Sequence, residues 1–93
     1  MKIDNKELKV RPLSWTERDA LIEAGLDVVY NPVNFDNQVE YLTRVRKIMS
    51  FILKEVFKLT DKELNAISDK DATTFAREVM ELTYKEDAKT EKN

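Results

Sequence analysis

The chain has 93 residues, of which 42% are hydrophobic and 37% are charged, and its formal net charge is −2. It contains no cysteine and no histidine. The composition therefore excludes disulfide bonds, zinc sites made of Cys or His, and nucleophiles activated by a histidine. No apolar run approaches the roughly 20 residues of a membrane span. We therefore expect one small domain over residues 1–85, with a polar flexible tail over 86–93, in a cytoplasmic protein that has no membrane partner.

The first segment has the pattern of a short β-hairpin. Residues 1–3 and 7–13 flank an Asp-Asn turn, and Leu8 and Val10 alternate with charged residues. Pro12 restricts the second strand to an edge or to its last residues. Because two strands alone are marginal in water, we expect the hairpin to lie on the helices or to pair with another chain.

Three helix starts carry a capping box or a close variant of it. In each, a Ser or Thr is followed three residues later by an acid that can bond back to the cap. The three pairs are Ser14 with Glu17, Thr60 with Glu63, and Ser68 with Asp71. The first of these helices is expected to end near Gly25, with Trp15, Leu21 and Ile22 on its apolar side.

Residues 26–35 form an apolar segment with neither helical nor strand periodicity. Pro32 biases the residue before it away from the helical conformation. The segment therefore predicts a loop that either folds over the core or offers side chains to a partner. Val29, Tyr30 and Val33 are the candidates for such a partner contact.

A long periodic segment predicts a central helix from residue 34 or 36 to residue 58, on the order of 34 Å long. Its apolar residues occupy an arc about 180° wide, broader than the seam of a two-stranded coiled coil, so the helix needs cover on two sides. These residues are Val39, Leu42, Val45, Ile48, Met49, Ile52, Leu53, Val56 and Phe57. Arg46 falls within the arc, where we expect its stem to lie along the core edge.

Phe51 lies in the middle of the polar face of this helix, among Arg44, Lys47, Lys54 and Lys58. A single exposed aromatic is ordinary, but one ringed by long charged side chains also resembles a binding anchor, and both interpretations stay open. The surrounding segment is basic, whereas the C-terminal third of the chain is acidic. This asymmetry has two explanations. Acidic residues favour helix N-termini and basic residues favour helix C-termini, or the charges form a dipolar surface through which copies stack or a charged partner binds.

After Thr60 we expect a short helix and then a closing helix that starts at Ser68. The closing helix has one apolar face, expected to be core, made of Ala72, Phe75, Ala76, Val79, Met80 and Leu82. The predicted fold is mainly α, with a short N-terminal β-hairpin followed by a small bundle of about four helices and one long central helix.

No catalytic constellation stands out in the pattern. Pairs of acids such as Asp69 with Asp71 and Glu78 with Glu81 are ordinary on helix surfaces, and no histidine or glycine-rich loop accompanies them. We therefore expect no enzyme activity, cofactor, metal or small-molecule substrate. A small helical DNA-binding regulator and another protein-interaction module are the alternatives, but the net negative charge and the acids of the closing helix argue against nucleic acid.

Four passages, taken in order, resemble the small tail assembly chaperones of long-tailed bacteriophages and prophages. They are MKIDNKELKVRPLSWTER, NFDNQVEYLTRVRKIMSFIL, LTDKEL and DATTFAREVMELTYKE, and the resemblance covers most of the chain from Lys2 to about Lys85. It implies a non-enzymatic protein of the bacterial cytoplasm, absent from the mature virion, that binds and solubilises the tape-measure protein. It further implies recruitment of the tail-tube protein and a homo-oligomer along the client.

The resemblance transfers no site residue by residue, so the candidate partner-binding residues rest on expected exposure alone. They are Tyr30, Val33, Phe51 and Tyr84. A client that is a long helix is bound through apolar anchors on a helical scaffold, and a deep pocket is not needed.

Overall fold

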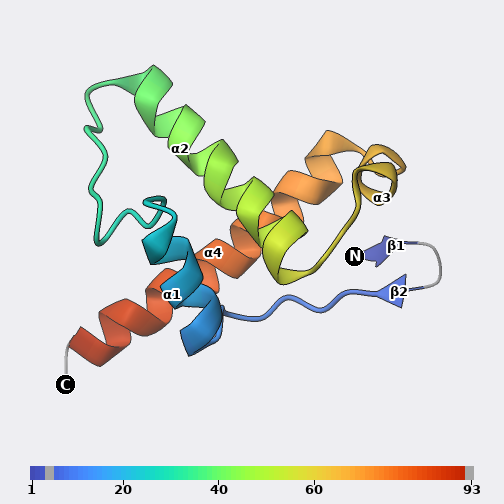
Figure 1. Ribbon diagram of the computed structural model, residues 1–93, viewed down its shortest axis with the longest axis horizontal. Coiled ribbons are helices and arrows are strands. Elements are labelled where there is room, and N and C mark those ends of the chain that lie inside the picture. The colour runs from blue at the N-terminus through green and yellow to red at the C-terminus, as the bar shows by residue number, and fades with distance from the viewer. Residues whose placement is uncertain (4–5, 92–93) are drawn as a thin grey trace.

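The computed structural model describes residues 1–3 and 6–91, with side chains described as far as Lys85 (Figure 1). Its elements in chain order are β1 (Lys2–Ile3), β2 (Lys6–Glu7), α1 (Trp15–Glu23), α2 (Gln38–Phe51), η1 (Ile52–Val56), α3 (Asp61–Asn65) and α4 (Asp69–Glu91). η1 is a π-helical turn that continues α2 without a break. A short hairpin followed by four α-helices confirms the predicted fold class.

The hairpin is shorter than its sequence pattern indicates. β1 and β2 are antiparallel, with Lys2 opposite Glu7 and Ile3 opposite Lys6. The second strand, predicted over residues 7–13, spans only Lys6–Glu7. Leu8 still exchanges two hydrogen bonds with Met1, at 2.8 and 3.0 Å, and the chain then leaves the hairpin. The predicted Asp-Asn turn lies outside the described residues.

The chain between β2 and α1 lies on the core as an extended segment. Leu8, Val10 and Leu13 are half-buried against the core cluster, and the burial of Leu8 and Val10 agrees with their alternation. The backbone N–H of Leu13 donates to Thr83 Oγ1 at 2.9 Å, and the buried Thr83 hydroxyl donates to the carbonyl of Val79 at 2.8 Å. One hydroxyl of α4 therefore fastens the N-terminal segment in place.

The helix starts follow the predicted capping pattern. Complete capping boxes are present at Ser14 with Glu17 and at Thr60 with Glu63. At the third start, Ser68 Oγ accepts a hydrogen bond from the backbone N–H of Asp71 at 3.0 Å. α2 begins later than expected, because Asn37 caps it by accepting from the N–H of Glu40 at 3.1 Å.

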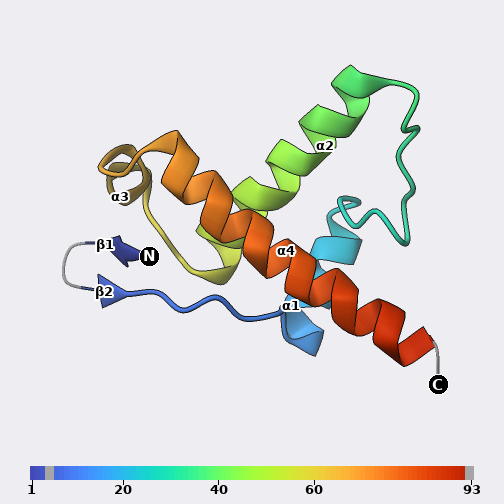
Figure 2. The same ribbon diagram turned by 180° about the vertical axis from the view of Figure 1, so that it is seen from behind.

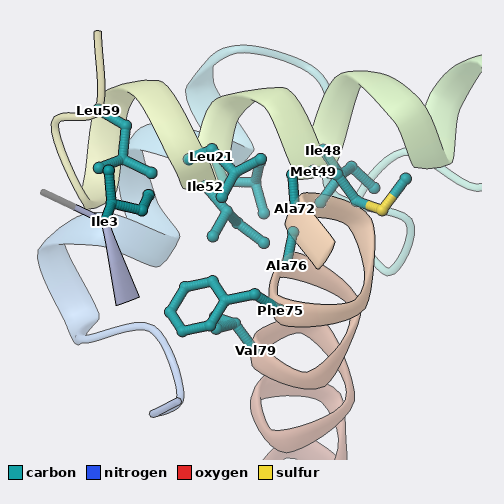
Figure 3. Close-up of a cluster of buried hydrophobic side chains, with 11 residues drawn as sticks. Ile3, Leu21, Ile48, Met49, Ile52, Leu59, Ala72, Phe75, Ala76 and Val79 are labelled. Atoms are coloured by element: carbon teal, nitrogen blue, oxygen red, sulfur yellow. The ribbon is translucent and has the colours of Figure 1, made fainter. Parts of the chain in front are cut away.

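The hydrophobic core lies where α4 crosses the C-terminal part of α2 and η1 (Figures 1 and 2). Ile48 and Ile52 come from one side of this crossing, and Ala76 and Val79 come from the other. Leu21 of α1 fills the remaining space, as the close-up of the cluster shows (Figure 3). The small side chain of Ala76 lets the two helices approach closely.

Two apolar side chains of α1 and α4 differ from the burial expected of them. Trp15, expected on the apolar side of α1, is 86% exposed, and Leu82, expected in the core face of α4, is also exposed. Arg46 has an exposed guanidinium that pairs with Asp69 at 2.7 Å, and it borders the same groove as Met49 and Leu53. The periodic pattern identifies the face of a helix but not how far along the helix a neighbour covers that face.

α4 spans 23 residues and continues to Glu91, into the segment 86–93 for which the sequence predicts a flexible tail. The side chains of 86–91 and residues 92–93 lie outside the described part of the chain, so flexibility of this segment stays a prediction.

Glu17 links the cap of α1 to the N-terminal segment. Its carboxylate accepts two hydrogen bonds from Arg11, at 2.7 and 2.9 Å, and one from the backbone N–H of Ser14 at 2.8 Å. The Arg11 bonds are the largest cause that lowers the pKa of Glu17 from its ordinary 4.5 to about 2. Arg11 also lies over the ring of Phe57, at 5.0 Å from its centroid.

We predict that Glu17 makes the free energy of unfolding depend on pH below 4.5. Because its pKa is depressed in the folded state, Glu17 contributes stability that is fully present above 4.5 and is lost as the pH falls towards 2. Urea unfolding at a series of pH values should therefore show a smaller loss of stability in Glu17→Gln than in the wild type over this range. Equal losses in both proteins would contradict the assignment.

α1 ends at Glu23, two residues before Gly25 and thus near the glycine where its sequence predicts the end. Gly25 has φ +74°, and its N–H donates to the carbonyl of Ile22 at 2.9 Å. A Cβ at this position would meet only Asn31 Nδ2 at 3.8 Å, which is an ordinary contact. The glycine is therefore needed for its backbone conformation and not for space.

We predict that Gly25→Ala lowers the free energy of unfolding by about 1–2 kcal/mol, the cost of a left-handed conformation in a residue with a Cβ. Gly25→Asn is the matched control, because asparagine tolerates this conformation better, and it should lose less. Thermal and urea unfolding measure both values. An alanine variant as stable as the wild type would show that the end of α1 adapts to another geometry.

Candidate functional site

The N-terminal half of α2 extends past the other helices. Both views show α2 and α4 diverging from their crossing point, so that the first turns of α2 have no helix packed against them (Figures 1 and 2). Val39 and Leu42 are accordingly 75% and 61% exposed. The burial predicted for the apolar arc of this helix is correct for Ile48, Met49 and Ile52 and wrong for its first two turns.

Two aromatic side chains extend this uncovered region. The rings of Phe35 and Tyr41 lie 5.4 Å apart, tilted by 46°, and both side chains are exposed. Phe35, Val39, Tyr41 and Leu42 are together called the α2 tip surface. Exposed apolar side chains grouped at one end of a helix are typical of a protein-interaction site, whereas scattered ones are ordinary.

The loop before α2 is fastened to α1 by a buried ion pair. Asp27 has no exposed surface, and its carboxylate accepts from Arg18 Nε, from Arg18 Nη2 at 3.2 Å and from the backbone N–H of Val29 at 2.9 Å. The Arg18 guanidinium lies 4.9 Å from the ring centroid of Tyr84 and 5.9 Å from that of Tyr30. A buried carboxylate with these partners orients the loop strongly.

A second set of bonds ties the same loop to α2. Arg44 Nη1 donates to the carbonyl of Asn31 at 2.7 Å and to that of Leu26 at 3.4 Å. The side-chain amide of Asn31 donates to the carbonyl of Gly25 at 2.8 Å. The first part of the loop, from Gly25 to Asn31, is therefore bonded to both α1 and α2.

We predict that Asp27→Ala lowers the free energy of unfolding by about 3–5 kcal/mol, because it removes the carboxylate that faces a largely buried Arg18. The double variant Arg18→Met with Asp27→Ala should recover part of this loss, since the charge is removed as well. A double-mutant cycle of urea unfolding measures the coupling. Additive losses would show that the two side chains are energetically independent.

The four predicted partner-binding residues do not form one surface. Tyr30 is exposed, as expected, whereas Tyr84 is half-buried, and the rings of both lie near the Arg18 guanidinium. The exposure expected of Val33 is wrong, because Val33 is 5% exposed and covers the core. Phe51 is half-buried and packs partly against the core cluster.

Sequence reasoning missed the α2 tip surface and the Arg18–Asp27 pair. Val39 and Leu42 carry the same periodic signal as their buried neighbours, so no local feature distinguishes them. Arg18 and Asp27 are nine residues apart on different elements, and their pairing depends on the path of the loop.

A groove of about 410 Å³ separates the C-terminal part of α2 and η1 from α3 and the start of α4. Its apolar lining includes Met49, Leu53 and Leu64. Two exposed ion pairs, Arg46 with Asp69 at 2.7 Å and Lys54 with Asp61 at 2.9 Å, join its two sides. The groove therefore has charges of both signs at its edge, and these charges satisfy one another.

Within the described residues, no group of three or more carboxylate, histidine or cysteine side chains is placed to hold a metal ion. Likewise, none of the described helices combines the length and apolarity needed to cross a membrane. No protein family, curated protein sequence or solved structure matches the chain. The resemblance to tail assembly chaperones therefore stays a prediction.

Proposed function

We propose that this chain is a non-enzymatic chaperone that binds an apolar helical segment of another protein through the α2 tip surface. The observation that carries the proposal is the exposure of Val39 and Leu42 beside the Phe35–Tyr41 pair, at the free end of a helix. Such a surface suits an amphipathic helix whose apolar stripe needs cover.

The binding energy available at this surface is substantial for its size. Fully burying a large apolar side chain stabilises a complex by about 1.5–3 kcal/mol, and Val39 and Leu42, three residues apart, lie on the same side of α2. Binding also has to offset the loss of translational freedom and of loop motion. Because Arg44 and the Arg18–Asp27 pair already hold the loop, little entropy is lost by restricting loop motion on binding.

The resemblance makes the proposal more specific. On this basis the client is the tape-measure protein of a long-tailed phage, whose extended apolar helices are kept soluble in the bacterial cytoplasm. Tail-tube protein is the second partner, several copies associate along the client, and the protein is absent from the mature virion. The polar side chains around the surface, among them Asp36 and Glu40, would keep the complex soluble.

We predict that co-expression with the tape-measure protein encoded beside this chain raises the soluble fraction of that protein. The double variant Val39→Ser with Leu42→Ser should abolish most of this effect and weaken binding by about tenfold or more, because two apolar anchors are lost. Both positions are exposed, so the variant should fold with nearly wild-type stability. Soluble yield and pull-down of the client measure the effect.

Trp15→Ser is the matched control, since Trp15 is a large exposed apolar residue on another helix. It should leave the solubility of the client unchanged. A client equally soluble with and without this chain would contradict the chaperone function, whereas equal activity of the tip variant and the wild type would contradict the assigned surface.

A further inference from the structure

The segment that contains α3 buries little of its own surface. It comprises residues 60–69, between the buried Leu59 and the buried Ala72, and we call it the α3 lid. None of the described residues of α3 itself is buried, and the apolar contacts of the lid with the core cluster come from the half-buried Leu64 and Ile67. Both views place α3 at the edge of the molecule, beyond the crossing of α2 and α4 (Figures 1 and 2). Segments with few buried apolar contacts are the first to open locally.

The backbone hydrogen bonds of the α3 lid are local. Thr60 and Glu63 form the capping box of α3, and the N–H of Leu64 donates to the carbonyl of Thr60 at 2.9 Å. The N–H of Ala66 donates to the carbonyl of Glu63 at 3.2 Å. Both partners of each bond belong to the lid. Movement of the lid as a unit would therefore leave these bonds intact.

Among the described residues, three ion pairs join the α3 lid to the rest of the protein. In each of them the lid supplies the carboxylate and another element supplies the cation. The pairs are Lys54 with Asp61 at 2.9 Å, Arg46 with Asp69 at 2.7 Å and Lys6 with Glu63 at 3.4 Å. The first two are exposed at both partners, and the third is exposed at its lysine. Charges that face water attract each other weakly and are screened by salt.

The groove of about 410 Å³ lies directly beneath the α3 lid. Leu64 and Ile67 line it from the lid, whereas Met49, Leu53 and Ala72 line it from the other side and are buried. Side chains do not fill this space, so the lid forgoes part of the apolar contact that a packed helix would make. The three ion pairs therefore account for a larger share of its attachment than such pairs do for a packed helix.

We propose that the α3 lid opens as a unit and that ionic strength sets how often it opens. In the open form Met49, Leu53 and Ala72 reach water, while the crossing of α2 and α4 stays packed. Salt favours the open form, because it screens the ion pairs and leaves the caps within α3 in place. The apolar surface that the protein presents at this end of α2 therefore depends on salt. The lid lies at the other end of α2 from the tip surface and does not depend on the proposed chaperone function.

The chain has no cysteine, so a single introduced thiol can report opening of the lid. Ala72→Cys places a thiol in the wall of the groove, where the closed lid shields it. Its labelling by neutral N-ethylmaleimide should become about threefold faster or more as sodium chloride is raised from about 0.05 M to about 0.5 M. The rate is divided by that of the exposed Thr74→Cys, which reports the intrinsic reactivity of a thiol on the same helix. Met49→Cys, on the opposite wall, should respond in the same way.

Val79→Cys is the control for global unfolding, because Val79 has no exposed surface and does not line the groove. Its labelling should be slower than that of Ala72→Cys at every salt concentration. Equal rates at these two positions would show that the lid does not open separately and would overturn the proposal. So would a rate ratio of Ala72→Cys to Thr74→Cys that salt leaves unchanged.

A triple variant removes the three cations without altering any residue of the α3 lid. It combines Lys6→Gln, Arg46→Gln and Lys54→Gln. In the Ala72→Cys background it should label about threefold faster or more at low salt, and most of the salt dependence should be lost, because the charges that salt screens are absent.

The matched control changes the net charge equally at exposed positions outside the three pairs. It combines Lys9→Gln, Lys47→Gln and Arg77→Gln. This variant should label within about twofold of the Ala72→Cys protein and should keep its salt dependence. Equal acceleration by the two triple variants would overturn the assignment of the lid to these ion pairs.

Discussion

The packing of α4 against the C-terminal part of α2 determines which apolar residues of this small protein are covered. Ala76 has no exposed surface and brings the two helices together, so that Ile48, Ile52 and Val79 lose their contact with water. Because α2 diverges from α4 beyond this crossing, α4 does not cover the first turns of α2. The α2 tip surface is a direct consequence of this crossing.

The loop between α1 and α2 would be free to cover that surface if it were not fastened elsewhere. Instead, Asp27 is buried against Arg18, and Arg44 holds the carbonyls of Leu26 and Asn31. A buried charge pair contributes orientation more than net stability, because desolvation offsets much of its attraction. Here it directs Val33 into the core and leaves Tyr30 at the surface.

The same helix therefore carries two surfaces of different chemistry. The α2 tip surface consists of exposed apolar side chains, whereas the C-terminal part of α2 and η1 border a shallow depression whose lining includes Leu26, Phe51, Lys47 and Glu55. The π-helical turn η1 ends at Val56, and Lys58, two residues later, has a left-handed backbone conformation. Both surfaces depend on the anchored loop, which supplies Phe35 to one and Leu26 to the other.

The sequence by itself determined the features that depend on neighbours within a few residues. The capping boxes at Ser14 and Thr60 are present, and α1 ends near Gly25. The apolar face of α4 is buried at Ala72, Phe75, Ala76 and Val79. These signals are local because hydrogen bonds within one helical turn produce them.

Only the tertiary structure decided how far each apolar face is covered and which charges meet. Val39 and Ile48 belong to the same apolar arc of α2, yet Val39 is exposed and Ile48 is buried. The apolar periodicity is the same along the helix and does not reveal where α4 crosses it. The pairing of Arg18 with Asp27 likewise depends on a loop whose path long-range contacts select. The candidate surfaces therefore emerge from packing between elements, which no periodic pattern within one element encodes.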